Sequence, residues 1–420
     1  MNANLATGSA GFQPAVSRIS NPLPSETGGT SEYSGGCTVP TRAGRFTLNG
    51  SDALEQHLAS VCKKVHAGIG RIIPKQRLEG LVLGGGYGRG EGGVLKTPAG
   101  DQPYNDLEFY VLVRRLLWLN ERRYAKSLHQ LAEELSSVAG VELEFKITSV
   151  AKLRRSPQNL FYHDLIMGHQ WLLGDERLFA GCDHHRDAET IPLSEATRLL
   201  MNRCSGLLFA RDKLEHERFS SDDADFVGRN IAKTELALGD AVLIAFGKYH
   251  WSCRERGQRL SDLATSENLP WLEEVRQHHT GGVEFKLQPH QSSLSRAELQ
   301  KQFREVSSLA LGVFLWLENR RLDYYFRSAA DYASSRINKW PDTNGWRNRL
   351  ANLRVFGPRA LLIPRPSRHP RERILNALVL LLWMRTQTSP ALTRKVRREL
   401  LSSEPTAMIP AYRKRWSRAC

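Results

Sequence analysis

The chain has 420 residues, 41% of them hydrophobic and 25% charged, and this composition excludes a globally disordered protein. Because the length exceeds that of an ordinary single domain, we expect two folded domains with tails. The net charge of +15 favours anionic partners, and residues 346–420 carry nearly all of the excess, with 17 lysines and arginines against three acidic residues.

The chain is predicted to begin with a tail and one helix. Residues 1–45 are rich in Gly, Ser, Thr and Pro and offer few apolar positions, so we expect them to be disordered. Ser51 is placed to cap a helix in which Leu54, Leu58 and Val61 recur at helical spacing. A helix therefore precedes the first strand.

Strand and helix signals alternate in the next part of the chain. Short strands are predicted over 81–83 and 107–113, separated by a loop that contains Gly and Pro. A helix over 122–138 follows, and the strict alternation of apolar and charged residues over 141–147 predicts a half-buried strand. This order predicts an α/β (α+β) domain with a mixed sheet over residues 46–180.

The second half of the chain is predicted to be helical. Long periodic segments cover residues 194–217, 224–251, 296–327 and 371–385. We therefore expect a mainly α-helical domain over 181–390, on the acceptor side of a cleft, followed by a basic tail over 391–420.

The sequence carries no sign of export or of a membrane span. The six cysteines are widely spaced and form no C-x-x-C pair, which favours a reducing compartment. The start of the chain lacks the apolar region of a signal peptide, and the longest apolar run, Ala377 to Met384, falls far short of the roughly 20 residues of a spanning helix. We expect a cytoplasmic protein.

Two short motifs in the α/β region carry the chemical signal. Residues Leu81 to Gly93 read LVLGGGYGRGEGG, and Tyr104 to Val113 read YNDLEFYVLV. The pair resembles the DNA polymerase beta-like nucleotidyltransferases, whose small members include aminoglycoside nucleotidyltransferases and minimal nucleotidyltransferases of toxin-antitoxin pairs. In that superfamily a strand is followed by G-S-x-x-R-G-E, and a second strand carries S-D-x-D. The resemblance covers about residues 81–175 and implies a polymerase-beta-like fold.

The first motif is suited to holding phosphate groups. Glycines after a strand let backbone N–H groups approach phosphate oxygens without collision with side chains. We therefore predict that Gly85 and Gly86 bind the triphosphate of an NTP, with Arg89 adding a fixed positive charge.

The second motif is suited to holding a divalent cation. One residue separates Asp106 from Glu108 on a predicted strand, so both carboxylates point to the same face. Carboxylate oxygens are the ligands that Mg²⁺ and Mn²⁺ prefer, and metal ions at such a site stabilise the charges of nucleotidyl transfer. We predict Asp106 and Glu108 to be catalytic metal ligands for Mg²⁺ (or Mn²⁺).

The resemblance also implies a third carboxylate on the strand after the intervening helix. Glu142 and Glu144 both lie on the correct face, and we prefer Glu144 because the basic Lys146 follows it by two residues. Its predicted role is to hold metal beside the attacking hydroxyl and to help remove the proton. The alternative, a solvated face of alternating Glu residues, stays open.

Two features depart from the family pattern and support an alternative. The loop over 92–105 is longer than in minimal members, and Glu108 stands where Asp is commoner, which shifts a carboxylate by about an ångström. The alternative is a catalytically inactive relative that binds nucleotide or nucleic acid.

In the helical half, charged residues admit two interpretations. Arg229, Lys233 and Asp240 form one side of a predicted helix, either as a solvated face or with Lys233 reaching the triphosphate, as basic helical residues do in two-domain nucleotidyltransferases. The paired histidines at 184–185 and 278–279 are expected in surface loops. Among the basic residues 413–416, Trp416 is predicted either to stack on a base or to sit in a groove.

Together these patterns predict a metal-dependent nucleotidyltransferase. It would move an NMP from an NTP to a hydroxyl acceptor and release pyrophosphate. The acceptor is unidentified: a small molecule is favoured, and RNA or protein is the alternative, with nucleic acid contacted through the basic C-terminus.

Overall fold

The computed structural model describes residues 44–384, 389–402 and 408–419, which form two compact units. The sheet unit holds residues 44–187 and 287–289, and the helical unit holds the other described residues from 188 onward. The predicted domain boundary, at 180–181, lies close to this division. Of the predicted tail over 1–45, only the last two residues belong to the described chain, so its predicted disorder stays a prediction.

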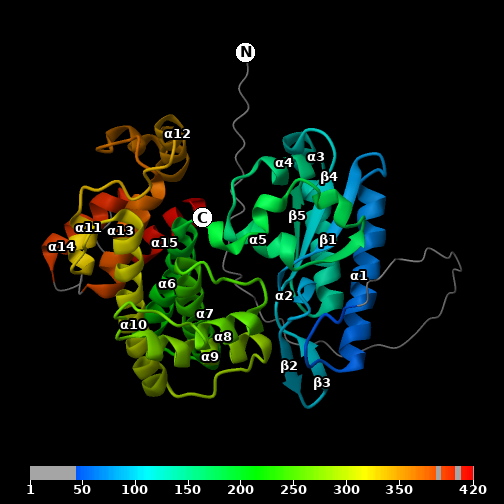
Figure 1. The fold of residues 1–420 in the computed structure, drawn as a ribbon, viewed down its shortest axis with the longest axis horizontal. Helices are drawn as coiled ribbons and strands as arrows, with labels where there is room; N and C mark the ends of the chain where they lie inside the picture. Colours follow the sequence, from blue (N-terminus) through cyan, green and yellow to red (C-terminus); the bar gives the residue numbers. More distant parts are fainter. Residues whose placement is uncertain (1–43, 385–388, 403–407, 420) are drawn as a thin grey trace, which may run out of the picture. The chain divides into compact units, whose positions relative to one another are not determined.

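The sheet unit is built on a four-stranded mixed sheet (Figure 1). Its strands are β1 (Leu78–Leu83), β4 (Leu107–Val113), β5 (Leu143–Thr148) and β6 (Gln170–Leu173), in the order β5-β4-β1-β6. β1 is antiparallel to both β4 and β6, whereas β4 and β5 are parallel. The predicted mixed α/β architecture is confirmed, and β4 has the predicted bounds.

Helices cover both faces of this sheet (Figure 1). The helices α1 (Asp52–Ile72) and α3 (Leu117–Ala139) pack on one face, and α4 (Val150–Arg155) and α5 (Leu160–Met167) on the other. As predicted, the Ser51 side chain caps α1 by accepting a hydrogen bond from a backbone N–H group.

Alternation along the strands decides which side chains face which helices. On β4, Phe109 and Val111 belong to the core beneath α1 and α3, whereas Tyr110 and Leu112 belong to the core beneath α4 and α5. Glu108 therefore lies on the α5 side of the sheet.

The segment between β1 and β4 differs from the prediction. We expected a loop, but β2 (Val94–Thr97) and β3 (Gly100–Pro103) pair as a hairpin within it. Gly100 takes a φ of 116°, which few other residues tolerate and which allows the tight reversal. Short strands with few β-branched residues give little signal in the sequence.

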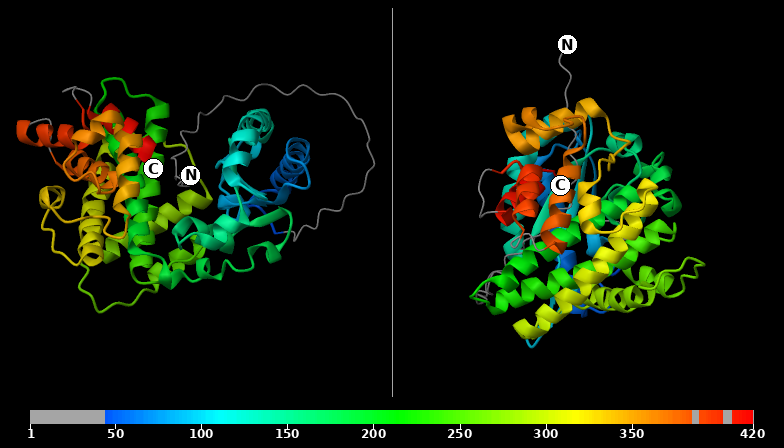
Figure 2. Two further views of the ribbon diagram at one scale, coloured as in Figure 1. Left: turned by 90° about the horizontal axis from the view of Figure 1, so that it is seen from above. Right: turned by 90° about the vertical axis from the view of Figure 1, so that its left-hand side faces the viewer.

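The helical unit contains the helices from α6 to α15. They are α6 (Leu193–Glu215), α7 (Ser221–Ala245), α8 (Cys253–Ser261), α9 (Leu272–Leu287), α10 (Arg296–Leu322), α11 (Ala329–Ser334), α12 (Gly345–Phe356), α13 (Pro370–Trp383), α14 (Pro390–Leu400) and α15 (Met408–Ala419). The long helices α6, α7 and α10 pack against one another (Figures 1 and 2). Within the described ranges, no helix has both the length and the apolar character needed to cross a membrane.

The basic C-terminal region is helical where the structure describes it. We predicted a tail over 391–420, but this range contains most of α14 and all of α15. Tyr412 and Trp416 are buried, and the ring of each packs against Phe209 of α6. Trp416 therefore belongs to the core of the helical unit, which corrects the idea that it stacks on a base.

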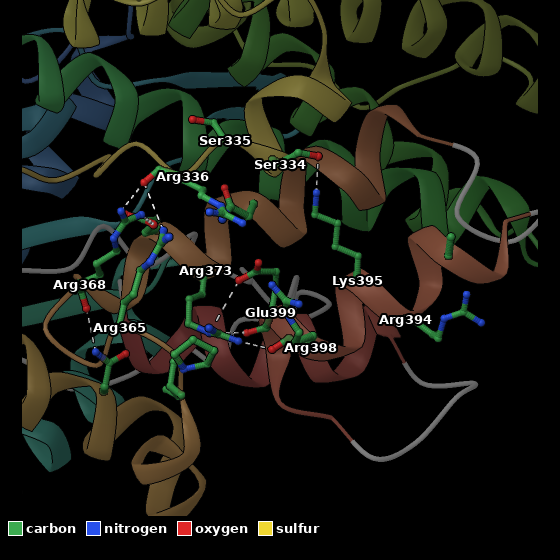
Figure 3. Close-up of a pocket in the computed structure, with 17 residues that line it drawn as sticks. Ser334, Ser335, Arg336, Arg365, Arg368, Arg373, Arg394, Lys395, Arg398 and Glu399 are labelled. Carbon is green, nitrogen blue, oxygen red and sulfur yellow. Dashed lines mark hydrogen bonds and ion pairs between the residues drawn. The ribbon is translucent and has the colours of Figure 1, made fainter.

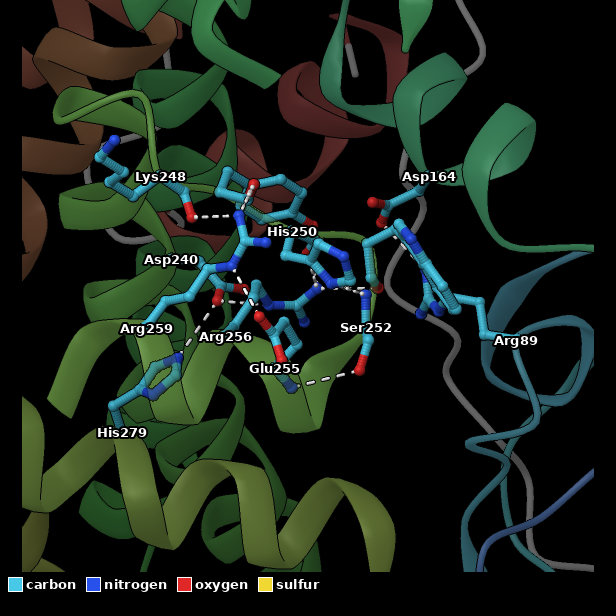
Figure 4. A network of polar contacts seen from close by, with 12 residues as sticks. Arg89, Asp164, Asp240, Lys248, His250, Ser252, Glu255, Arg256, Arg259 and His279 are labelled. Carbon is cyan, nitrogen blue, oxygen red and sulfur yellow. Dashed lines mark hydrogen bonds and ion pairs between the residues drawn. The ribbon is translucent and has the colours of Figure 1, made fainter. Parts of the chain in front are cut away.

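The histidine pairs were expected in surface loops, but one histidine of each pair is buried, whereas His184 is exposed and His278 is half-buried. His185 is fully buried, and its Nε2 lies 3.0 Å from the Leu153 carbonyl oxygen. His279 is buried in α9, with Nε2 3.2 Å from Oδ1 of Asp240, and Arg256 lies 2.7 Å from the same oxygen (Figure 4). Asp240 therefore belongs to a buried polar network, not to a solvated face.

Gly88, five residues after the end of β1, should be sensitive to substitution. A Cβ at Gly88 would overlap the Leu83 carbonyl oxygen, whereas a Cβ at Gly70 in α1 would meet nothing within 4 Å. We expect Gly88→Ala to destabilise the protein by about 1–3 kcal/mol through overpacking. Gly70→Ala should stabilise it by roughly 0.5–1 kcal/mol because alanine favours helix. Thermal unfolding measures both, and equal melting temperatures would contradict this packing.

Candidate active site

The two sequence motifs meet at the end of β1. The Gly84 N–H donates to the Glu108 carbonyl oxygen at 2.9 Å, and a one-turn helix, α2 (Gly85–Gly88), follows. Gly85 has a φ of 63°, and a Cβ there would lie 3.1 Å from Oε1 of Glu108. The segment Gly84 to Gly86, called the glycine loop below, thus lies directly against the carboxylate of the second motif.

The glycines of this loop also serve the packing of the protein itself. A Cβ at Gly84 would lie 2.5 Å from the Tyr110 ring. Gly86 is buried, and its Cβ would lie 3.2 Å from the Glu91 carbonyl oxygen. N–H groups at the start of a helical turn have no acceptor within that turn, so Gly85 and Gly86 begin α2 with donors suited to an anion.

Glu108 is held in an ionised, hydrogen-bonded state. The Tyr110 hydroxyl donates to its Oε2 at 2.6 Å, and Nζ of Lys146 lies 2.8 Å from the same oxygen. Burial raises the pKa of Glu108, but the Lys146 charge and these two hydrogen bonds outweigh burial and hold the pKa below its usual range. Glu108 therefore carries its negative charge at neutral pH.

Glu144 lies opposite Glu108 on the parallel neighbour strand. The two residues are aligned in register, and Nζ of Lys146 lies 3.0 Å from Oε2 of Glu144. Burial raises the pKa of Glu144, and Lys146 offsets only part of that effect. Glu142 precedes β5 and is exposed, and the Glu144 side chain is itself about half exposed, at 47%. Of the two acids left open by the sequence, only Glu144 is joined through Lys146 to Glu108.

Asp106 stands just before β4, on the same side as Glu108 by the alternation of the strand. Its charge contributes to raising the pKa of both Tyr87 and Glu144, although burial is the main cause in each case. Asp106 therefore lies within electrostatic reach of Glu144.

The oxygen ligands of the three acids suit a hard divalent cation, although their carboxylates do not converge on one point. Within the described ranges, no group of three or more His, Cys, Asp or Glu is placed to hold a metal ion. Between Glu108 and Glu144 stands the Lys146 ammonium instead. Carboxylate oxygens from Asp106, Glu108 and Glu144 are the ligand type that Mg²⁺ and Mn²⁺ prefer.

Arg89 is fixed by an ion pair. Its NH1 lies 3.0 Å from Oδ2 of Asp164 on α5, and both side chains are largely buried (Figure 4). The Arg89 charge also contributes to lowering the pKa of Glu108. A phosphate at the glycine loop would thus meet a guanidinium that Asp164 already orients.

Lys233, the other basic residue predicted to bind nucleotide, lies on α7 of the helical unit and is partly buried. Its neighbour Arg229 pairs with Asp225 at 3.0 Å on the same helix. The proposed contact of Lys233 with a triphosphate stays a prediction.

Sequence reasoning missed two partners of the site residues, Tyr110 and Asp164, and named Lys146 only as a neighbour of Glu144. The alternation of β4 places Tyr110 beside Glu108, and the alternation of β5 places Lys146 beside Glu144, so both carried a signal in the sequence. Asp164 is 75 residues from Arg89 in the sequence, and no local pattern indicates that the two residues pair.

If the Lys146 ammonium occupies the position of a metal ion between the two glutamates, its removal should strengthen metal binding. We expect Lys146→Met to bind Mn²⁺ about tenfold more tightly than wild type, because one competing charge within about 3 Å of two carboxylates is lost. Calorimetric titration with Mn²⁺ measures this, with Lys126→Met, an exposed lysine of α3, as the matched control. Weaker binding by Lys146→Met would show that Lys146 instead organises the acids.

Comparison of this chain with models of protein families, with curated proteins and with solved structures found no match, so the site stands on its own geometry.

Proposed function

We propose that the protein is a metal-dependent nucleotidyltransferase whose sheet unit has a polymerase-beta-like fold. It would transfer an NMP from an NTP to a hydroxyl acceptor with release of pyrophosphate. The observation that carries the proposal is the contact between the glycine loop and the second motif, where Gly85 stands against the Glu108 carboxylate. A triphosphate site and a cation site are needed side by side for this reaction.

The proposed fold is supported by the connection of the strands. β1 ends in the glycine loop, β4 runs antiparallel to β1 and begins at the acidic motif, and β5 returns parallel to β4 with the third acid. The glycine loop and the strand ends that carry the three acids therefore lie at the same end of one sheet, as the family resemblance implies.

The glycine loop is proposed to hold the triphosphate. The N–H groups of Gly85 and Gly86 would donate to phosphate oxygens, and Arg89 would add a charge-assisted contact while Asp164 keeps its side chain in place. Because this contact is oriented before the nucleotide arrives, little side-chain entropy is lost on binding.

The acids are proposed to organise the reacting groups. Asp106, Glu108 and Glu144 would hold Mg²⁺ or Mn²⁺, which when bound supplies charge neutralisation for the α-phosphate and the pyrophosphate. Glu144 would accept the proton of the attacking hydroxyl. Tyr110 keeps the Glu108 carboxylate in place through its 2.6 Å hydrogen bond. We favour a small-molecule acceptor, with RNA or protein as the alternative.

Pyrophosphate release tests this proposal. Each of the four NTPs is incubated with the full chain and Mg²⁺ or Mn²⁺, in the presence of pooled hydroxyl acceptors. We expect metal-dependent release that requires an acceptor and favours one nucleotide. Absence of release with every NTP, metal and acceptor pool would contradict the proposal.

One observation favours a second candidate function, nucleotide binding without turnover. Lys146 bridges Glu108 and Glu144, as an ammonium that replaces a metal ion would do in a non-catalytic relative. This candidate predicts that calorimetry detects NTP binding in EDTA, because Lys146 then supplies the charge that a metal would supply. The nucleotidyltransferase predicts NTP binding that is strongly enhanced by Mg²⁺.

A further inference from the structure

A cavity of about 610 Å³ lies within the helical unit, outside the site described above. Its walls come from the end of α11, from the segment before α13, and from α13 and α14 (Figure 3). Small-molecule sites commonly have volumes of roughly 300–1,000 Å³. The cavity therefore has the size of a metabolite site.

The lining is strongly basic. Six arginines and one lysine line the cavity, against two acids, Glu372 and Glu399. Arg368 pairs with Glu372 at 2.6 Å, and Nε of Arg373 lies 3.8 Å from a carboxylate oxygen of Glu399, so each acid is matched by an arginine. The other cations of the lining are Arg336, Arg365, Arg394, Lys395 and Arg398. No ion pair joins these five to an acid within the described ranges.

Local contacts hold some of these cations at the wall. Arg365 and Arg368 both donate to the carbonyl oxygen of Arg336, and Lys395 of α14 reaches Ser334 of α11 (Figure 3). Positive charges gathered in a concave site repel one another and raise the local positive potential. A bound anion reduces this repulsion. Arginine forks match phosphate oxygens in particular, because they donate two parallel hydrogen bonds.

We propose that this cavity binds a small molecule that carries at least two phosphate groups. The phosphates would meet the unmatched arginines. The volume of the cavity, about 610 Å³, favours such a molecule over a nucleic acid, whose backbone follows an extended groove. This site is independent of the proposed nucleotidyl transfer.

Calorimetric titration of the full chain in EDTA tests the proposal, with inorganic tripolyphosphate and an inositol trisphosphate as probes. Arg336 and Arg398 are exposed and carry no acidic partner within the described chain, so Arg336→Ala, Arg398→Ala should keep the fold. The matched control is Arg347→Ala, Arg354→Ala, which removes two exposed arginines of α12 outside the cavity. We expect about tenfold or more weakening in the cavity variant and almost none in the control.

If the double arginine variant fails to fold, Arg394→Ala replaces it. Failure of both probes to bind wild type would overturn the proposal, as would equal weakening in the control. An RNA oligonucleotide that depends on Arg336 and Arg398 while neither probe competes would replace it with a nucleic-acid site.

Discussion

Replacing both acids of the second motif is expected to abolish turnover. Asp106→Asn, Glu108→Gln removes two negative charges while it keeps side-chain volume and hydrogen-bonding capacity. Metal-assisted stabilisation of a phosphoryl transition state is worth several kcal/mol, so we expect pyrophosphate release to fall by about a thousandfold. The amide introduced at position 108 retains an acceptor for the Tyr110 hydroxyl, so the fold should persist.

A neighbouring acid provides the control for this experiment. Glu142 is exposed and precedes β5, outside the bridge formed by Lys146. We expect Glu142→Gln to release pyrophosphate at nearly the wild-type rate. If the double variant stayed within tenfold of wild type, or if Glu142→Gln lost as much, the assignment of these acids would be wrong.

The second large effect concerns the stability of the helical unit. Glu318 on α10 is fully buried and accepts hydrogen bonds from the Thr197 and Tyr332 hydroxyls, each at 2.6 Å. Nε and NH2 of Arg321, also largely buried, lie 2.7 and 2.6 Å from its two oxygens. Removal of one partner of a buried ion pair leaves an uncompensated charge and commonly costs about 3–5 kcal/mol.

We therefore expect Glu318→Ala to lower the melting temperature of the helical unit by roughly 10 °C, as measured by calorimetry. Glu305, an exposed acid of the same helix, gives the control, because Glu305→Ala should change stability by less than about 0.5 kcal/mol. Similar melting of the two variants would contradict the buried network.

Much of the sheet unit was predictable because local patterns decide it. The alternation over 141–147 places Leu143, Phe145 and Ile147 against the core beneath α1 and α3, as expected. The capping residue Ser51 and the strand over 107–113 were also predicted correctly. Each of these features depends on neighbours in sequence, where period and capping chemistry are direct signals.

The features that were missed depend on contacts distant in sequence or on sparse apolar residues. In α14, Val396 and Leu400 face the core among many arginines and lysines, so the charge count suggested a tail. Lys146 was noticed only as a neighbour of Glu144, because a bridge to Glu108 requires the pairing of β4 with β5. The basic cavity likewise joins α11, α13 and α14, which no single segment reveals.

The destination of the transferred phosphate tests the central claim most directly. The protein is supplied with Mg²⁺, an acceptor pool and the preferred NTP, labelled either at the α-phosphate or at the γ-phosphate. The account predicts that only the α-label reaches an acceptor and that the γ-label leaves as pyrophosphate. Transfer of the γ-label to an acceptor, or its release as free phosphate, would contradict nucleotidyl transfer and assign the glycine loop and Glu108 to a different reaction.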